Sequence, residues 1–227
     1  MLTIPLHGLV LRRHPADMGL LPDGVATDGG DEQAKKYSKP VAEAVRSRTF
    51  LWLSLAFGFS VLASISIRVH FIPYLINVGF DSSRAAWLAG FIGVTQVVGR
   101  VIFAPFEVRF SARTVTTAIM LLLTVSFGIL LFAQTLFFVW AFVLVFGAAF
   151  GAMTLARPVL LADLYGVAEY GRINSIMAFV MTMVLTLAPI GAGLIFEWTA
   201  SYQVVLWVLL ACAALSVVAI QQLPKDT

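Results

Sequence analysis

The stretch TVTTAIMLLLTVSFGILLFAQTLFFVWAFVLVFGAAFGAMTLA, residues 114–156, contains no Asp, Glu, Lys or Arg. An α-helix rises 1.5 Å per residue, so about 20 apolar residues cross the hydrocarbon core of a bilayer. These 43 residues are too many for one crossing, and Ala133-Gln134-Thr135 is their polar break. The stretch therefore predicts two transmembrane helices joined by a tight turn.

The composition of the whole chain also indicates a membrane protein. Of the 227 residues, 60% are hydrophobic and 12% are charged, and the mean hydropathy is +0.93. Ordinary soluble domains contain about 45–50% apolar and about 25% charged residues. A soluble chain of this length could not bury so much apolar surface.

Further charge-free runs predict four more spans, and continuous rather than alternating hydrophobicity makes all of them helices. The single cysteine, Cys212, lies in the last span and excludes an internal disulfide. The sequence thus predicts an all-α membrane protein with six transmembrane helices, at about 50–76, 84–106, 114–133, 136–160, 173–195 and 201–221.

The basic residues are distributed unevenly between the two predicted sides. If the amino-terminal segment is cytoplasmic, thirteen of the fifteen Lys and Arg lie on or near the inside, and only Arg68 and Arg84 lie outside. This predicts a multi-pass protein of the cytoplasmic (inner) membrane with both termini in the cytoplasm. The net charge of +3 then reflects topology, and no nucleic acid is expected as a partner.

The first 48 residues differ in kind from the rest. They are polar, rich in Gly, Pro and Asp, and predict a flexible cytoplasmic segment with a short helix at 39–48. Residues 49–222 are expected to form the six-helix bundle, and residues 223–227 a cytoplasmic tail. The apolar MLTIPLHGLV at 1–10 is too short to span, and we interpret it as the last turns of a helix whose beginning is missing.

Five motifs occur in the order in which they occur in transporters of the major facilitator superfamily. LRRHPADMGLLPDG (11–24) resembles the central cytoplasmic loop, and HFIPYLINVGF (70–80) resembles the end of the seventh helix. GRVIFAPFEVRFSAR (99–113) is similar to the loop motif after the eighth helix. GAAFGAMTLARPVLLADLYG (147–166) and APIGAGLIFEWTASY (188–202) resemble the tenth and eleventh helices with their exits. The resemblance is closest to the bacterial monocarboxylate and oxalate/formate branch.

The resemblance implies a fold and a function. The fold would be one half of a major facilitator fold, made of two inverted three-helix repeats. The function would be secondary transport of small organic anions such as monocarboxylates, with a proton as a candidate coupling ion. Because the family has twelve helices, it also implies a truncated or half-length form that needs a second six-helix half, in a homodimer or from a separate chain.

The loop motif departs from the family pattern, and two other functions stay open. Ala104, Val108 and Ser111 stand where the family usually has Gly, Asp and Gly. The conformational latch served by that Asp is therefore expected only if Glu107 substitutes for it. The alternatives to transport are a membrane partner protein without transport of its own and an inactive gene remnant.

Arg100 is a charge inside a predicted span. It shares a helical stripe with Gly93, Gln96, Ala104 and Glu107, which are small or polar, so this face is not expected to meet lipid. The resemblance matches Arg100 to an arginine of the eighth helix that binds the substrate carboxylate, with Gln96 one turn deeper. The alternative is that Arg100 snorkels to the cytoplasm or pairs with Glu107.

His70, Tyr74 and Asn77 form a second polar face, because they are spaced i, i+4, i+7. They are candidate substrate-binding residues, and His70 could carry a proton. The alternative is that they anchor the helix at the outer interface. Arg68 points elsewhere and is expected to snorkel outward.

Charged residues near the inner surface are candidate gating residues: Glu107, Arg109, Arg113, Arg157 and Asp163. The resemblance implies that they form ion pairs of a cytoplasmic gate, and the alternative is that they only provide the positive-inside signal and its counter-ions.

Other patterns predict packing and exclude several classes of protein. Gly147 with Gly151, and Ala148 with Ala152, form small-xxx-small pairs that predict close helix contact. The sequence has no serine-hydrolase, zinc-protease or Walker motif and no His and Cys at metal spacing. We therefore expect no enzyme, no cofactor and no metal.

Overall fold

The computed structural model describes residues 40–166 and 169–224, and every regular element in this part of the chain is an α-helix. Six of the helices are long and apolar enough to cross a membrane, which confirms the six predicted spans. One short helix precedes them. The elements are α3 (Val41–Arg46), α4 (Arg48–Val78), α5 (Ser82–Arg109), α6 (Ala112–Leu130), α7 (Leu136–Tyr165), α8 (Tyr170–Thr199) and α9 (Tyr202–Gln221).

Several helices are longer than their predicted spans. α5 continues to Arg109 and α7 to Tyr165, because an apolar run marks the hydrocarbon core while the helix continues into the interface. α6 is shorter than predicted and ends at Leu130. The predicted helix at 39–48 is α3, which stops at Arg46. Most of the predicted amino-terminal segment and the end of the predicted tail lie outside the described residues.

Local capping sets where the helices begin and end. The side chains of Ser47, Asp81 and Ser111 accept hydrogen bonds from backbone N–H groups in the first turns of α4, α5 and α6. Each cap satisfies an N–H that has no partner inside its helix. α4 ends at Val78 and is followed by Gly79, whose φ of 106° lies in the left-handed region that favours glycine. A short loop therefore returns the chain into α5.

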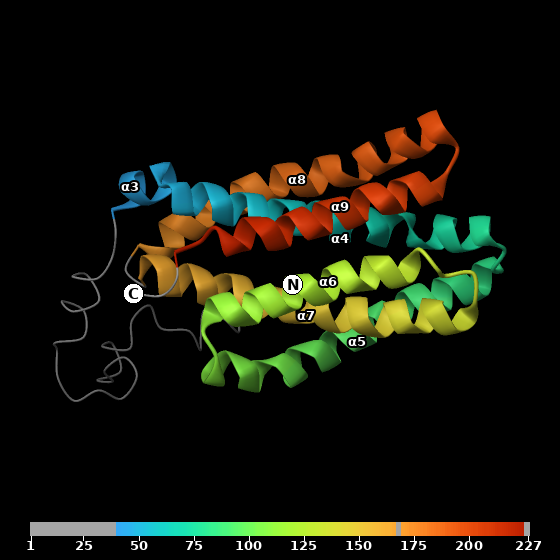
Figure 1. The fold of residues 1–227 in the computed structure, drawn as a ribbon, viewed down its shortest axis with the longest axis horizontal. Helices are drawn as coiled ribbons and strands as arrows, with labels where there is room; N and C mark the ends of the chain where they lie inside the picture. The colour runs from blue at the N-terminus through green and yellow to red at the C-terminus, as the bar shows by residue number, and fades with distance from the viewer. Residues whose placement is uncertain (1–39, 167–168, 225–227) are drawn as a thin grey trace, which may run out of the picture.

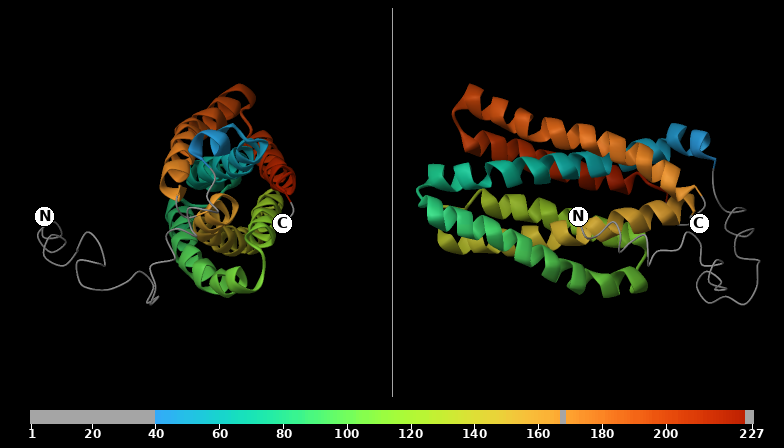
Figure 2. Two further views of the ribbon diagram at one scale, coloured as in Figure 1. Left: turned by 90° about the vertical axis from the view of Figure 1, so that its left-hand side faces the viewer. Right: turned by 180° about the vertical axis from the view of Figure 1, so that it is seen from behind.

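The six long helices alternate in direction along one common axis (Figure 1). The start of α4 and the end of α9 consequently lie at the same end of the bundle, next to α3. We call this the α3 end and the other the far end. Seen along the axis, α6 and α9 lie together on one side (Figure 2).

The packing partners reveal an internal repeat. α4 packs against α8 and α9, α7 packs against α5 and α6, and α6 meets α9. Exchanging α4–α6 for α7–α9 reproduces the same set of pairs. Since each repeat crosses the membrane three times, the second repeat starts from the opposite side and is inverted. This is the predicted arrangement of two inverted three-helix repeats.

α5 and α7 approach each other at their small residues. A Cβ placed on Gly99 would meet the backbone of Ala148, and one placed on Gly151 would lie 2.8 Å from the Cα of Gln96. The hydroxyl of Thr95 donates to the carbonyl of Val143 across the same contact, at 3.1 Å. The predicted close contact of α7 is thus confirmed, and its partner is α5.

Four helices contain a proline in their interior, and α6 and α9 contain none. The prolines are Pro73 in α4, Pro105 in α5, Pro158 in α7 and Pro189 in α8. Proline removes one helical hydrogen bond and bends the helix. The bent helices are therefore α4, α7 and their neighbours α5 and α8, while the α6–α9 side is free of proline kinks.

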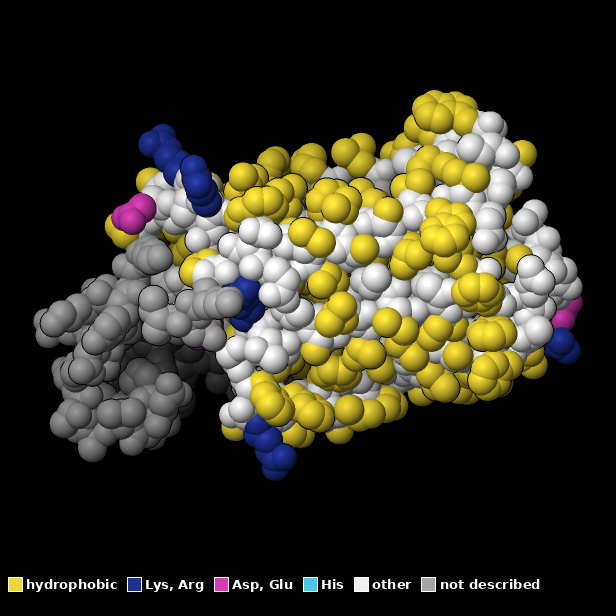
Figure 3. Space-filling model, viewed as in Figure 1, with side chains coloured by type: hydrophobic (Ala, Val, Ile, Leu, Met, Phe, Trp, Pro, Cys, Tyr) yellow, Lys and Arg dark blue, Asp and Glu magenta, His cyan; other side chains and the backbone are white. Residues whose placement is uncertain are grey.

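The surface agrees with membrane insertion. On the face shown in Figure 3, hydrophobic side chains cover the length of the bundle and charged side chains gather at its two ends. Exposed apolar side chains include Val101, Phe137 and Trp198, which are 71%, 74% and 79% exposed. Such a surface is stable in lipid rather than in water.

The close contact of α5 with α7 generates a first prediction. Gly151→Ala should lower the melting temperature of the purified chain in detergent, followed by tryptophan fluorescence. Its new methyl group has to displace backbone atoms of α5, and overpacking costs about 1–3 kcal/mol. Gly128→Ala in α6 is the matched control, because nothing lies within 4 Å of its Cβ position. Equal melting temperatures for the two variants would contradict this packing.

Candidate functional site

A cavity of about 350 Å³ opens between α4, α7 and α8. Most of its wall is apolar, and its polar groups are two threonines and an arginine. The hydroxyls of Thr154 and Thr182 donate to carbonyls of their own helices, at 2.7 and 2.9 Å. The residues that line it are Phe57, Val61, Ile65, Phe150, Met153, Thr154, Arg157, Ala178, Met181, Thr182 and Leu185.

Arg68 lies at the edge of this cavity. It follows Ile65 by three residues on α4 and therefore continues the same helix face by one turn. Its guanidinium carbon lies 5.2 Å from the centre of the Phe150 ring, across from α4 on α7. A cation at this distance over an aromatic face is attracted to it.

The depth of Arg68 follows from a hydrogen bond near the far end. The hydroxyl of Tyr74 donates to the carbonyl of Leu130, the last residue of α6, at 3.0 Å. Arg68 precedes Tyr74 by six residues, so its Cα lies about 9 Å from the level of Leu130, toward the middle of the bundle. For comparison, the whole of α6 is about 28 Å long. Arg68 is thus well within the membrane thickness. We expected it to snorkel outward, and the ring of Phe150 is what holds it at this depth instead.

Arg100 lies level with Phe150. The neighbouring Gly99 packs on Ala148, so Arg100 leaves α5 beside α7 residues 148–150. α5 and α7 run in the same direction. Two parallel α-helices turn in the same sense along the chain but touch through opposite faces. The residue that follows a contact on one helix therefore points to the same side of the pair as the residue that precedes a contact on the other. Arg100 follows Gly99, and Phe150 precedes Gly151, so both turn to one side of the bundle.

We call this side the open face and define it by Arg68, Arg100, Phe150, Thr154 and Arg157. The structure brings together on this face two arginines, Arg68 and Arg100, that lie on different predicted spans. Arg100 was predicted as a site residue. Arg68 is predicted to lie on the outside, and its place on this face follows only from its contact with Phe150 of α7.

The predicted stripe around Arg100 is largely exposed in this bundle. Gly93, Arg100 and Ala104 are exposed, and Gln96 is half-buried against α7. α5 continues nine residues beyond Arg100, so Arg100 lies about 14 Å from the end of the helix. Arg100 is therefore farther from the helix end than in the predicted span, which stops at residue 106. The side chain of Glu107, its predicted alternative partner, lies outside the described residues.

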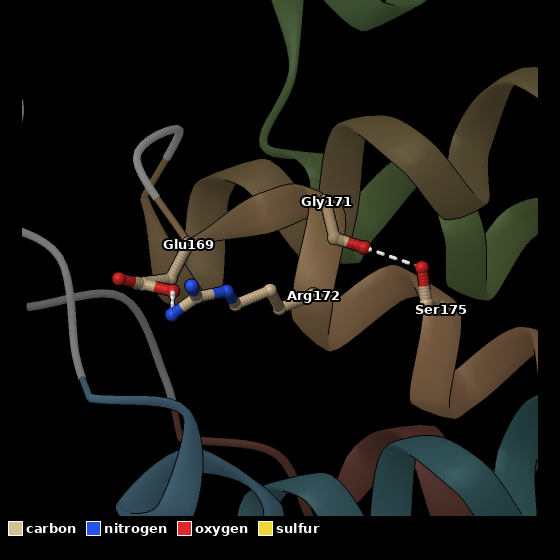
Figure 4. A network of polar contacts seen from close by, with 4 residues as sticks. All are labelled: Glu169, Gly171, Arg172 and Ser175. Carbon is tan, nitrogen blue, oxygen red and sulfur yellow. Dashed lines mark hydrogen bonds and ion pairs between the residues drawn. The ribbon is translucent and has the colours of Figure 1, made fainter.

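Among the described side chains, the ion pairs lie away from the open face. Asp81 and Arg84 approach to 3.7 Å at the far end, and Glu169 and Arg172 to 3.5 Å at the α3 end (Figure 4). Arg68, Arg100 and Arg157 take part in neither. An arginine at the centre of a membrane helix costs about 2.5–3.5 kcal/mol when it enters lipid. The open face therefore suits water or a covering protein rather than lipid.

The predicted polar face of His70, Tyr74 and Asn77 lies elsewhere. The Nε2 atom of His70 lies 3.1 Å from the carbonyl oxygen of Pro189. The hydroxyl of Ser66 donates to the carbonyl oxygen of Ala188 at 2.7 Å. Both contacts join α4 to α8. Tyr74 is buried. The predicted binding residues therefore lie in three places: Arg100 and Gln96 on α5, His70 in the contact of α4 with α8, and Tyr74 and Asn77 at the far end of α4.

Asn77 lines a second crevice, of about 420 Å³, at the far end of the bundle. Uncharged polar groups dominate its wall, among them Gln134, Ser201 and Gln203. It lies between the ends of α4, α6 and α9. This crevice is separate from the open face.

The predicted gating residues are also distributed over two places. Arg157 lies in the cavity, Arg109 and Asp163 are exposed near the α3 end, and Arg113 donates to the backbone carbonyl of Gln221 in α9 at 2.8 Å. Within the described side chains no ion pair joins them, and the gate stays a prediction. In the same described part of the chain, no three His, Cys, Asp or Glu group to hold a metal ion.

Comparison with known proteins gives a family match over most of the chain. The family model of the Major Facilitator Superfamily matches residues 53–226. The chain is 30% identical over 165 residues to an MFS-type transporter of Gibberella moniliformis, a match covering 69% of this chain and 38% of that protein. It is 23% identical over 190 residues to monocarboxylate transporter 12 of Mus musculus, covering 75% and 39% of the two chains. The chain thus spans about two fifths of the length of these relatives.

A solved structure supports the fold. The bundle is similar to the crystal structure of a bacterial homologue of the iron transporter ferroportin in an inward-facing state, with a TM-score of 0.66 and 18% sequence identity. The match covers 79% of this chain and 46% of that chain. The six helices thus have the fold of part of a known membrane transporter.

The assignment of the open face generates a second prediction. In a Cys212→Ser background, Thr182→Cys should react with a charged, water-soluble thiol reagent in membrane vesicles, because the reagent needs a hydrated thiolate. Leu215→Cys in α9, where the native side chain is 48% exposed, should stay unmodified because it faces lipid. Labelling is read by mass spectrometry. Protection of Thr182→Cys together with labelling of Leu215→Cys would reverse the assignment of the two faces.

Proposed function

The chain belongs to the major facilitator superfamily, and on that premise we propose that it forms the anion-binding half of a secondary transporter for small organic anions such as monocarboxylates. It is a multi-pass membrane protein. The observation that carries the proposal is the cationic open face, where Arg100 turns outward from α5 with no acidic partner among the described side chains. We expect no catalytic activity.

The chemistry of the open face suits a carboxylate. A guanidinium presents paired N–H donors that match the two oxygens of a carboxylate, and the pairing is strongest where water is scarce. Gln96 lies one turn from Arg100 and adds an amide to the same stripe. The name of monocarboxylate transporter 12, a relative at 23% identity, refers to the same class of substrate.

The open face also supports a covering partner. Arg68, Arg100 and Arg157 are costly in contact with lipid, and a second six-helix body would enclose them in an aqueous path. We propose that this body is either a second copy of the chain, in a homodimer, or a separate chain. Substrate would then cross as the two halves rock against each other.

We propose that the α3 end faces the cytoplasm, with residues 1–48 as a cytoplasmic segment and 223–227 as a tail of the inner-membrane protein. The described charges favour this orientation, because Arg46, Arg48, Arg109 and Arg113 lie at the α3 end and Arg84 at the other. A proton is a candidate coupling ion, and His70 is the residue that we propose to carry it.

The third prediction tests transport. Arg100→Ala should reduce the uptake of labelled butyrate at least tenfold in vesicles from cells that express the full chain. The loss of hydrogen bonds to a charged group costs about 1.5–3 kcal/mol. The measurement is the initial rate at equal protein content in the membrane.

Arg84→Ala is the matched control, because Arg84 is exposed at the far end and pairs with Asp81. Its uptake should equal that of the parent chain. If Arg100→Ala transports at the parental rate, Arg100 is not the anion-binding residue. If the parent chain itself gives no uptake above empty vesicles, a membrane partner protein or an inactive remnant becomes the better interpretation.

A further inference from the structure

We propose that the α3 end of the bundle holds an anionic phospholipid, with its phosphate on Arg113 and one acyl chain between α5 and α6. The inference goes beyond the proposed function, because this site lies around α6 and not on the open face. It also gives a role to the end of the motif at 99–113, which the proposed transport does not use.

A cavity of about 510 Å³ lies between the start of α6 and the end of α9, at the α3 end of the bundle (Figure 1). Arg113 is the charged residue of its wall. The Nη2 atom of Arg113 donates to the carbonyl and to the side-chain oxygen of Gln221, at 2.8 and 3.4 Å. A guanidinium has five N–H donors, and within the described part of the chain all hydrogen bonds of this one come from Nη2. Nη1 and Nε therefore remain for a phosphate.

A second cavity, of about 310 Å³, lies between α5 and α6 and has an apolar wall of phenylalanines. The ring centres of Phe103 and Phe106 lie 6.0 Å apart, and those of Phe106 and Phe110 lie 6.2 Å apart. Phe106 and Phe110 are 46% and 53% exposed. Phenylalanine lacks the polar tip with which Tyr and Trp anchor a helix at the interface. This row of rings therefore suits an acyl chain.

The two cavities adjoin and open toward lipid. Thr114 and Ala118 line both of them, so the cavities lie on the two sides of one ridge of α6. The ridge continues with Leu121 and Val125 at helical spacing, and these side chains are 48% and 54% exposed. An exposed apolar ridge on a membrane-spanning helix is suited to lipid. One lipid molecule at this ridge therefore reaches both cavities.

The cation and the rings lie at the depths of a phosphate and an acyl chain. α6 has 19 residues. Its length of about 28 Å is close to the thickness of about 30 Å of the hydrocarbon core. Arg113, the second residue of α6, thus lies at the edge of that core. Phe103 precedes the end of α5 by six residues, which places it about 9 Å farther in.

Charge favours an anionic lipid over a zwitterionic one. Among the described side chains, the ion pairs lie elsewhere and leave Arg113 without an acidic partner. Val108, near the end of α5, is 88% exposed and uncharged where the family usually has Asp. An acidic side chain at that position would repel a phosphate, whereas a zwitterionic lipid would add a second cation beside Arg113. Basic pockets between membrane helices are typical sites for anionic head groups.

The competing explanation is that Arg113 only caps α9. Gln221 is the last residue of that helix, and its carbonyl has no partner inside the helix. The test must therefore separate the binding of a lipid from the loosening of a helix end. Two lipids with the same acyl chains and different head groups make this possible.

The experiment is native mass spectrometry of the purified full chain in detergent, with phosphatidylglycerol and phosphatidylcholine as probes. The parent should bind phosphatidylglycerol about tenfold more tightly, because a hydrogen bond to a charged group is gained without a second cation. Arg113→Gln should bring the two affinities within about twofold of each other by weakening phosphatidylglycerol alone.

Two further variants test the two parts of the site. Phe106→Gln should weaken both lipids by a similar factor, because it replaces part of the apolar wall that both acyl chains contact. Arg46→Gln is the matched control and should change neither lipid, because Arg46 is exposed on α3 at the same end and lines neither cavity.

Melting temperatures keep the test valid if Arg113→Gln is less stable without lipid. A bound lipid stabilises the folded chain, so phosphatidylglycerol should raise the melting temperature of the parent more than phosphatidylcholine does. The two lipids should have equal effects on Arg113→Gln. If Arg113→Gln keeps the parental preference in both measurements, Arg113 is only a cap and the inference is wrong.

Two other results would assign the groove to a different occupant and overturn the inference. Glycerol 3-phosphate has the phosphate without the acyl chains, and displacement of phosphatidylglycerol at equal concentration would make a soluble phosphate the ligand. If the parent binds neither lipid and is a dimer that Phe106→Gln dissociates, the groove is a contact between two copies of the chain. The uptake assay of Arg100→Ala tests the proposed function independently of all these outcomes.

Discussion

The arrangement of this protein depends on keeping charged side chains inside the membrane thickness away from lipid. Two arginines, Arg68 and Arg100, are exposed at depths well away from both ends of the bundle, and a third, Arg157, lines the cavity. All three turn to one side, where α4, α5, α7 and α8 meet. On the α6–α9 side, apolar side chains such as Leu121 and Leu215 are exposed, and Arg113 lies at the α3 end, where it donates to the carbonyl of Gln221. The α6–α9 side of the bundle is thus suited to contact with lipid, and the open face to contact with water, a ligand or protein.

The inverted repeat supplies this division. Because the same packing pairs occur in both repeats, α4 and α7 occupy equivalent central positions, and α5 and α8 flank them. The two flanking helices are held in different ways. α5 meets α7 through small residues such as Gly99 and Gly151, whereas α8 meets α4 through hydrogen bonds from Ser66 and His70 to the carbonyls of Ala188 and Pro189. The close packing of α5 on α7 sets the position of Arg100 along the bundle axis. The hydrogen bonds from α4 hold α8 at its bend.

Phe150 connects α4 with the α7 segment that packs on α5. It lies on α7 between Gly147 and Thr154, where it lines the cavity and receives the guanidinium of Arg68 from α4. A ring is a suitable partner for a cation at this depth, because it attracts the charge without neutralising it. The cation consequently keeps its capacity to attract an anion. An acidic side chain in the same place would have removed that capacity.

The sequence by itself determined the number of spans, their approximate bounds and the small-residue contact of α7. These are local properties: a charge-free run has to enter the bilayer, and Gly147 and Gly151 have to meet another helix because they leave room for one. Only the tertiary structure decided which side each polar residue faces. His70 contacts α8 and Arg68 contacts Phe150, and both facts depend on the partner helix and on its register. A helical stripe in the sequence shows which residues lie together but not what they face, because that depends on contacts between segments far apart in the chain.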